Sequence, residues 1–99
     1  MAVYMKAVIE CQTGKLLQLQ DTLLKIFPIM EAQGWKLLGC FVHASGRINT
    51  VTDLWELQDL DHVIRARAGL AAHPDYPAIR ASLSECIINE TLTFMERFR

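Results

Sequence analysis

The stretch that decides the fold runs from Gly46 to Leu57 and reads GRINTVTDLWEL. It opens with turn residues and continues as a segment rich in the β-branched and aromatic residues that favour strands. Unbroken alternation of side chains places Asn49, Asp53 and Trp55 on one face of that predicted strand. Polar groups beside a tryptophan indicate either the wall of a ligand site or a stabilised part of the core.

The segments before this stretch change from a period of two to a helical period and back. Val3–Cys11 alternates as a strand does, and Lys15–Gln33 repeats its apolar residues every three or four positions, which predicts a helix. Pro28 lies inside that helix, so we expect a kink or a broken last turn there. Trp35–His43 is apolar on both predicted faces, with Leu37, Gly39 and Phe41 on one and Leu38, Cys40 and Val42 on the other. This pattern predicts a strand that is covered on both sides.

The segments after it complete the pattern. They are a helix that starts at Asp59 or Asp61 and ends near Ala72, a turn at His73–Pro77, a helix at Ala78–Leu83 and a strand at Cys86–Met95. The order is therefore β-α-β-β-α-β, which predicts a ferredoxin-like α+β fold with a four-stranded antiparallel sheet and helices on one face. Residues 1–99 are enough for a single domain.

Composition excludes several classes of partner. The formal net charge is −1 and the basic residues are scattered, which argues against nucleic acid and against electrostatic docking to a membrane. No apolar run is long enough for a membrane span, and the first residues do not resemble a signal peptide. The three cysteines, an odd number without CxxC spacing, are typical of free thiols in a reducing compartment. We therefore expect a cytoplasmic protein.

The hydrophobic content predicts an assembly. It reaches 52%, which is high for a chain of 99 residues with a large surface-to-volume ratio. Two helices cover only one face of a four-stranded sheet, and the second and fourth predicted strands carry apolar residues on their other face. Large apolar faces are unusual on soluble monomers. We expect a homodimer in which the open sheet faces of two copies pack together.

The candidate site residues each have a functional and a structural interpretation. Asn49 could orient a substrate oxygen or bond the turn backbone, and Trp55 could stack on a flat substrate or fill the core. Asp53 could accept a proton or pair with a basic residue. His62 could shuttle a proton or face solvent. The remaining candidates are an arginine pair that could clamp a carboxylate, and a tyrosine that could donate to a substrate oxygen: Arg65, Arg67 and Tyr76.

Local motifs for metal, phosphate or nucleophilic chemistry are missing from the sequence. His43, His62 and His73 have no metal-ligand spacing, and there is no glycine-rich phosphate loop or GxSxG elbow. The sequence predicts neither a metal nor a cofactor.

Several segments resemble the NIPSNAP family of the dimeric α+β barrel superfamily. They are Gly34–Gly39, Gly46, Ile48–Val51 with Leu54–Glu56, Arg65–Arg67 and His73–Tyr76, and the similarity extends from about Val3 to Phe94. The resemblance implies a ferredoxin-like protomer and a dimer formed sheet to sheet. It also implies a cleft between sheet and helices, which superfamily monooxygenases and haem-degrading enzymes use.

The resemblance does not assign a reaction. Haem degradation in this superfamily needs an asparagine on the first strand, and Val3–Cys11 contains none. The function predicted is binding of a small, partly apolar organic molecule in the cleft, with cofactor-free monooxygenation or proton-transfer isomerisation as the chemistry. The alternative is a non-catalytic dimerisation module whose polar residues only satisfy one another.

Overall fold

The fold was analysed in a computed structural model that describes residues 2–99. The elements follow in the order β1 (Val3–Cys11), α1 (Leu16–Glu31), β2 (Lys36–Val42), β3 (Thr50–Leu57), α2 (Asp61–Ala71), α3 (Tyr76–Cys86) and β4 (Ile87–Met95). This is the predicted β-α-β-β-α-β order, with the second helical segment divided into α2 and α3. The strands form an antiparallel sheet in the order β2-β3-β1-β4, so the ferredoxin-like fold is confirmed.

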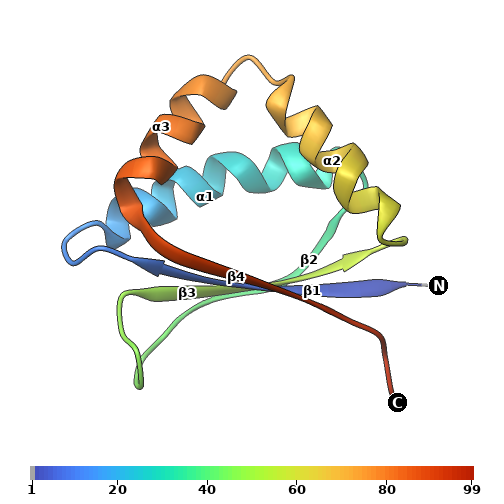
Figure 1. The fold of residues 1–99 in the computed structure, drawn as a ribbon, viewed down its shortest axis with the longest axis horizontal. Helices are drawn as coiled ribbons and strands as arrows, with labels where there is room; N and C mark the ends of the chain where they lie inside the picture. Colours follow the sequence, from blue (N-terminus) through green and yellow to red (C-terminus); the bar gives the residue numbers. More distant parts are fainter. Residues whose placement is uncertain (1) are drawn as a thin grey trace.

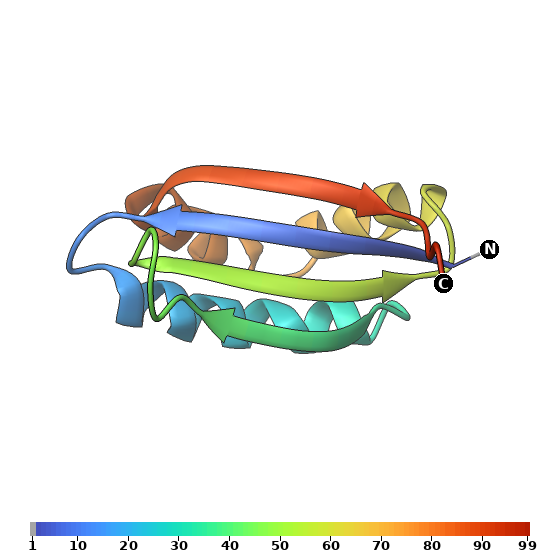
Figure 2. The same cartoon turned by 90° about the horizontal axis from the view of Figure 1, so that it is seen from below.

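The molecule has two layers. Helices α1, α2 and α3 all lie on one face of the sheet, and α2 and α3 meet at an apex above it (Figure 1). The view from below shows the other face of the sheet without a covering helix (Figure 2). As the sequence predicts, the sheet therefore has an inner face against the helices and an open face.

The core forms where the inner face of the sheet meets α1. The inward residues of β1 and β3 are buried because alternation directs every second side chain toward the helices. Those of β1 are Met5, Ala7, Ile9 and Cys11, and those of β3 are Val51, Asp53, Trp55 and Leu57. Helix α1 contributes a matching stripe at spacings of three and four: Leu19, Leu23, Phe27 and Met30.

Helix α1 runs through Pro28 and ends at Glu31, so the expected break does not occur. Pro28 removes the hydrogen bond to the carbonyl of Leu24, and both residues are exposed. Water can therefore bind the freed carbonyl, which lets the last turn continue. The chain then leaves the helix at Gly34, which has a φ of 92° and so the left-handed conformation predicted for it.

Strand β2 contains a bulge that the alternation did not predict. Its register against β3 shifts between Leu37 and Gly39, so that Leu37 opposes Trp55 and Cys40 opposes Asp53. Cys40 and Val42 therefore share the inner side with Leu37, and Gly39 and Phe41 move to the open side. The faces assigned from simple alternation are wrong beyond Leu38, because one extra residue reverses the facing of everything after it.

The open face is less apolar than expected. Directly opposed residues share a face, and β4 pairs Thr91 with Val8 and Thr93 with Lys6. The apolar residues Leu92 and Phe94 of β4 therefore face inward. Apolar side chains of the open face include Val8, Leu54 and Phe41, of which Phe41 is 58% exposed.

We predict that Leu19→Ala lowers the free energy of unfolding by about 2–5 kcal/mol, because it leaves a cavity in a fully buried site. Leu19 is 0% exposed near the N-terminal end of α1. Leu17→Ala in the same helix is the control, because Leu17 is 76% exposed. Its effect should stay within about 0.5 kcal/mol. Urea denaturation of both variants measures the difference, and equal effects would contradict this description of the core.

Candidate functional site

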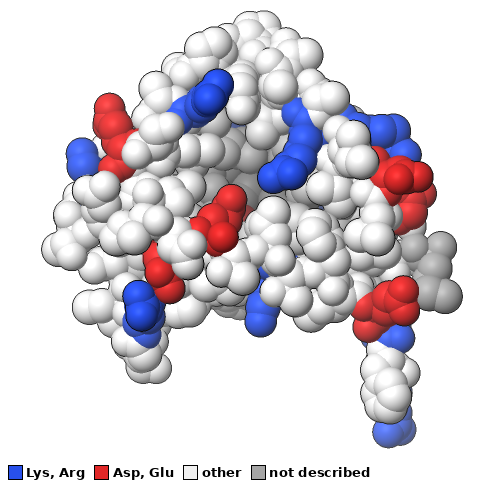
Figure 3. All heavy atoms as spheres, in the orientation of Figure 1, with Lys and Arg blue, Asp and Glu red and all other residues white. Residues whose placement is uncertain are grey.

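A cleft of about 650 Å³ lies between the sheet and the helices. All three helices and the strands β1, β3 and β4 line it, with side chains that include Met5, Phe27, Trp35, Asp53, Trp55, Val63, Arg67, Tyr76, Glu90 and Leu92. Figure 3 shows a hollow beneath the arch of α2 and α3, with acidic and basic side chains at its margin. Its size is that of a site for a small organic molecule.

Aromatic rings form one wall of the cleft. Trp55 of β3 packs edge-to-face against Phe27 of α1 and against Trp35, with ring centroids 5.4 and 5.5 Å apart. The strand alternation that buries Val51 also turns Trp55 inward, and the helical period of α1 brings Phe27 above it. Such mutual packing fixes the ring orientations and leaves an apolar surface that suits a flat ligand.

The indole Nε1 of Trp35 is a buried donor with no hydrogen-bond partner among residues 2–99. Trp35 also lines the cleft. A buried unpaired N–H costs about 1–3 kcal/mol, so a ligand acceptor that reached it would gain the interaction that the protein leaves unmade.

Asp53 places a carboxylate in this apolar cleft. Asp53 is 4% exposed, and the thiol of Cys40 donates a hydrogen bond to its Oδ1 at 3.2 Å. Burial raises the pKa of Asp53, while hydrogen bonds from Cys40 and Trp55 act in the opposite direction. Asp53 is thus an acid or base whose environment differs from that of a surface carboxylate.

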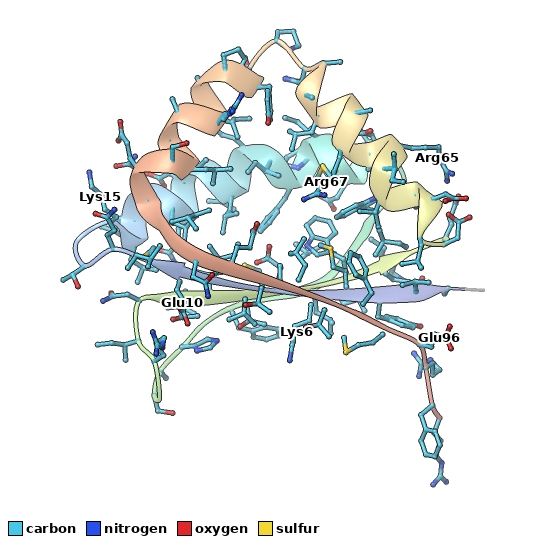
Figure 4. All side chains as sticks on the ribbon, in the orientation of Figure 1. Lys6, Glu10, Lys15, Arg65, Arg67 and Glu96 are labelled. Carbon is cyan, nitrogen blue, oxygen red and sulfur yellow. The ribbon has the colours of Figure 1, made fainter. Side chains whose placement is uncertain are left out.

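Two further charges line the cleft. Figure 4 shows Arg67 of α2 directed into the space between the helices and the sheet. Burial raises the pKa of the Glu90 carboxyl, Arg67 lowers it, and the negative charge of Asp53 raises it further. The Glu90 carboxyl therefore responds to both charges, that of Arg67 and that of Asp53.

Glu90 is a residue that sequence reasoning missed. It opposes Ile9 of β1, whose side chain is buried beneath the helices, so Glu90 lies on the inner side of β4. The sequence does contain a signal for it: Glu90 is a charged residue two positions before Leu92, on the face of β4 that otherwise carries apolar side chains. Its meaning depends on the register of β1 with β4, which one sequence does not fix.

His62 is buried behind the cleft wall, where its ring packs edge-to-face against Trp35 with centroids 6.3 Å apart, and it is not among the lining residues. Its Nδ1 accepts a hydrogen bond from the backbone N–H of Gln58 at 3.3 Å, which leaves Nε2 as the donor to the carbonyl of Gln33 at 2.6 Å. Its backbone N–H donates to Asp59 Oδ1 at 2.8 Å, so Asp59 caps the start of α2. Both ring nitrogens are occupied, and this geometry does not supply the proton shuttle suggested by the sequence.

The other sequence candidates divide between the cleft and the surface. Trp55, Asp53, Arg67 and Tyr76 line the cleft. Asn49 precedes β3 rather than belonging to it, with a left-handed φ of 57°, and its carbonyl accepts from the backbone N–H of Cys11. Its predicted place on the site face of the strand is wrong, because β3 begins at Thr50.

Arg65 also lies outside the cleft, although it is close to Arg67 in sequence. Its guanidinium is exposed and lies 3.9 Å from the carboxylate of Asp59. Residues two apart on a helix point in different directions, so Arg65 and Arg67 cannot clamp one ligand together. Among residues 2–99, no group of three or more histidine, cysteine or acidic side chains is arranged to hold a metal ion.

The fold is shared with solved structures of the α+β barrel class. A NIPSNAP-like domain protein from Burkholderia xenovorans is 18% identical with a TM-score of 0.83, and the match covers 98% of this chain and 85% of that one. A NIPSNAP family protein from Agrobacterium tumefaciens is 22% identical with a TM-score of 0.81, with 97% and 92% of the two chains covered. SnoaB, a cofactor-independent oxygenase from Streptomyces nogalater, is 11% identical with a TM-score of 0.71, with 99% and 94% covered.

The family follows from the sequence itself. The NIPSNAP family model matches residues 5–96, and the chain belongs to the NIPSNAP family. No curated protein matches the chain at a significant level. Within the described residues 2–99, none of the helices combines the length and the apolar character that crossing a membrane requires.

We predict that Asp53→Asn makes the protein more stable than the wild type at neutral pH, by on the order of 1 kcal/mol. The pKa of Asp53 is raised on folding, so the folded state binds this proton more tightly than the unfolded state does. Wild-type stability therefore falls as the pH rises from the ordinary carboxyl pKa through the raised one. Denaturation of both proteins between pH 3 and 8 (roughly the span over which a shifted carboxyl titrates) tests this. A stability difference independent of pH would contradict it.

Proposed function

We propose that the protein binds a small, partly apolar organic molecule in the cleft and that Asp53 exchanges a proton with it. The observation that carries this proposal is the carboxylate of Asp53, buried in an apolar cleft between sheet and helices. A raised pKa makes a carboxylate a stronger base once it is ionised, and it increases the fraction that holds a proton near neutral pH.

The cleft divides the ligand chemistry into two parts. The rings of Trp35, Trp55 and Phe27 suit a flat apolar body. The guanidinium of Arg67 suits an anionic oxygen, whether a carboxylate or the enolate formed when a proton leaves. Tyr76 adds a hydroxyl among the lining residues. We therefore propose enol acids, phenols and hydroxylated aromatic acids as the class to test.

Removal of a proton from an activated carbon or a phenol is common to two reactions. An isomerase returns the proton to another atom of the same molecule. In a cofactor-free monooxygenase, the anion formed by loss of the proton reacts with molecular oxygen. The fold of a named oxygenase supports the second route in general terms. Proton transfer by Asp53 is the step that the cleft geometry supports, and it serves either reaction.

We predict that ligand binding quenches the intrinsic fluorescence, because both tryptophans of the chain line the cleft. Titration with phenols, quinones and enol acids should give saturable quenching and a raised melting temperature. Arg67→Gln should weaken binding of anionic ligands about tenfold or more, the loss of one charge-assisted hydrogen bond. Arg65→Gln on the same helix is the matched control and should leave affinity unchanged.

Two outcomes would count against this function. A uniform lack of response across the ligand panel favours the alternative, a non-catalytic module whose polar residues only satisfy one another. Equal losses for Arg67→Gln and Arg65→Gln would place binding outside the cleft. For a bound ligand with an activated C–H group, exchange of that carbon-bound hydrogen with deuterium in D₂O, lost in Asp53→Asn, tests the proton transfer.

We also propose that the protein is a homodimer joined through the open sheet face. The support is the helix-free face itself (Figure 2). The strand pairing places Phe41 and the neighbouring Leu54 and Val8 on that face. Burying these side chains against a second copy removes apolar surface from water. The mixed polarity of the face, with Lys6 among its residues (Figure 4), adds polar contacts to that interface.

We predict that light scattering after size exclusion gives twice the chain mass of 11.2 kDa for the wild type. Phe41→Glu places a charge on the open face and should give the monomer. Ile64→Glu is the control, because Ile64 is 70% exposed on α2, away from that face. A wild-type monomer at low micromolar concentration, or a dimer sensitive only to Ile64→Glu, would contradict the interface.

The proposed location is the cytoplasm. Cys11, Cys40 and Cys86 are free thiols, as is usual for proteins of a reducing compartment. Fractionation of cells that make the protein would test this location.

A further inference from the structure

The bulge in β2 brings a thiol to the buried carboxylate. Cys40 opposes Asp53 in the β2–β3 ladder, and its Sγ lies 3.2 Å from Asp53 Oδ1. Without the extra residue at Leu38, alternation from Leu37 would direct Cys40 to the open face of the sheet. The irregular register therefore places a hydrogen-bond donor beside the only acidic residue on the inner face of β3.

The thiol keeps its proton in this position. Partial desolvation of the thiol, the hydrogen bond to Asp53 and the negative charge of Asp53 together raise the pKa of Cys40 to about 12. At neutral pH the group is S–H, which can donate to a carboxylate and is a poor nucleophile. Cys40 is thus suited to holding Asp53 and unsuited to covalent chemistry.

We propose that Cys40 is a positioning residue, which holds Oδ1 of Asp53 and so sets the orientation of the carboxylate that meets the ligand. This inference rests on the proposed function of Asp53. A donor that favours the ionised carboxylate opposes the effect of burial, so Cys40 helps Asp53 remain a base inside an apolar cleft. Bonding one oxygen also restricts rotation of the carboxylate, which orients the second oxygen before a ligand arrives.

The place of Cys40 in the fold makes the proposal testable. Strand β2 is an edge strand, and Cys40 is exposed there while Asp53 is buried. Replacing the thiol therefore removes the donor without opening a cavity in the core. The neighbouring Phe41 faces the open side of the sheet and provides a control on the same strand.

The experiment is a ¹³C-carboxyl NMR titration of the ligand-free protein, with the Asp53 signal identified by its absence in Asp53→Asn. Cys40→Ala should raise the pKa of Asp53 by about half to one pH unit, as expected for the loss of one donor. Cys40→Ser keeps a hydroxyl donor and should restore most of the wild-type value. Phe41→Leu should leave the titration unchanged.

Two results would overturn the proposal. One is an Asp53 titration that is the same in Cys40→Ala and the wild type. The other is a shift in Cys40→Ser as large as that in Cys40→Ala, which would show that the bond is not responsible. Because the titration needs no ligand, a negative ligand screen would refute the proposed function without altering this result.

Discussion

The burial of Asp53 is the interaction on which the site depends. Its neighbours on the inner face of β3, Val51 and Trp55, are held against the helices by the hydrophobic effect, and Asp53 lies between them. The fold cannot turn this one residue outward without turning the others outward too. A carboxylate fixed in that way needs donors and a compensating charge. Cys40 of the neighbouring strand and Trp55 supply the donors, and Arg67 places a positive charge among the lining residues of the same cleft.

The same constraint relates the sheet edge to the cleft. β2 is the edge strand that pairs with β3, and one extra residue at Leu38 changes which side chains of β2 face the helices. The bulge brings Cys40 to Asp53 and sends Phe41 to the open face. A single irregularity therefore affects both the proposed proton-transfer site and the proposed dimer interface. Bulges have this effect because they redirect every side chain that follows them.

The parts of the fold that follow from local patterns could be predicted from the sequence. The alternation in β1 and the helical stripe of α1 depend only on neighbours along the chain. For the same reason Asp53 and Trp55 were assigned to one common face of β3, and the structure shows that this is the inner face. The bulge in β2 and the inward position of Glu90 depend on pairing between strands, which is set by tertiary packing.

Two site candidates, His62 and Asn49, lie outside the lining of the cleft for reasons that a sequence pattern does not reveal. The ring of His62 is used by the backbone of Gln33 and Gln58, two partners that only the folded chain brings to it. Asn49 adopts the left-handed conformation that ends the loop before β3, and alternation does not extend through such a residue. In both positions a polar residue serves the backbone, which is the most frequent use of such groups near strand and helix ends.

The polar groups buried in the cleft lower the stability of the fold, and they distinguish a ligand-binding protein from a non-catalytic dimerisation module. A dimerisation module gains nothing from a carboxylate between Val51 and Trp55, and its stability would rise if an apolar residue replaced Asp53. It would also have no use for the unpaired Nε1 of Trp35 or for a second carboxylate, Glu90, near the first. Departures from optimal packing that converge on one cleft are typical of sites under functional constraint. The unpaired Nε1 of Trp35 and the two carboxylates lie together in one cleft, which supports binding there over a purely structural role.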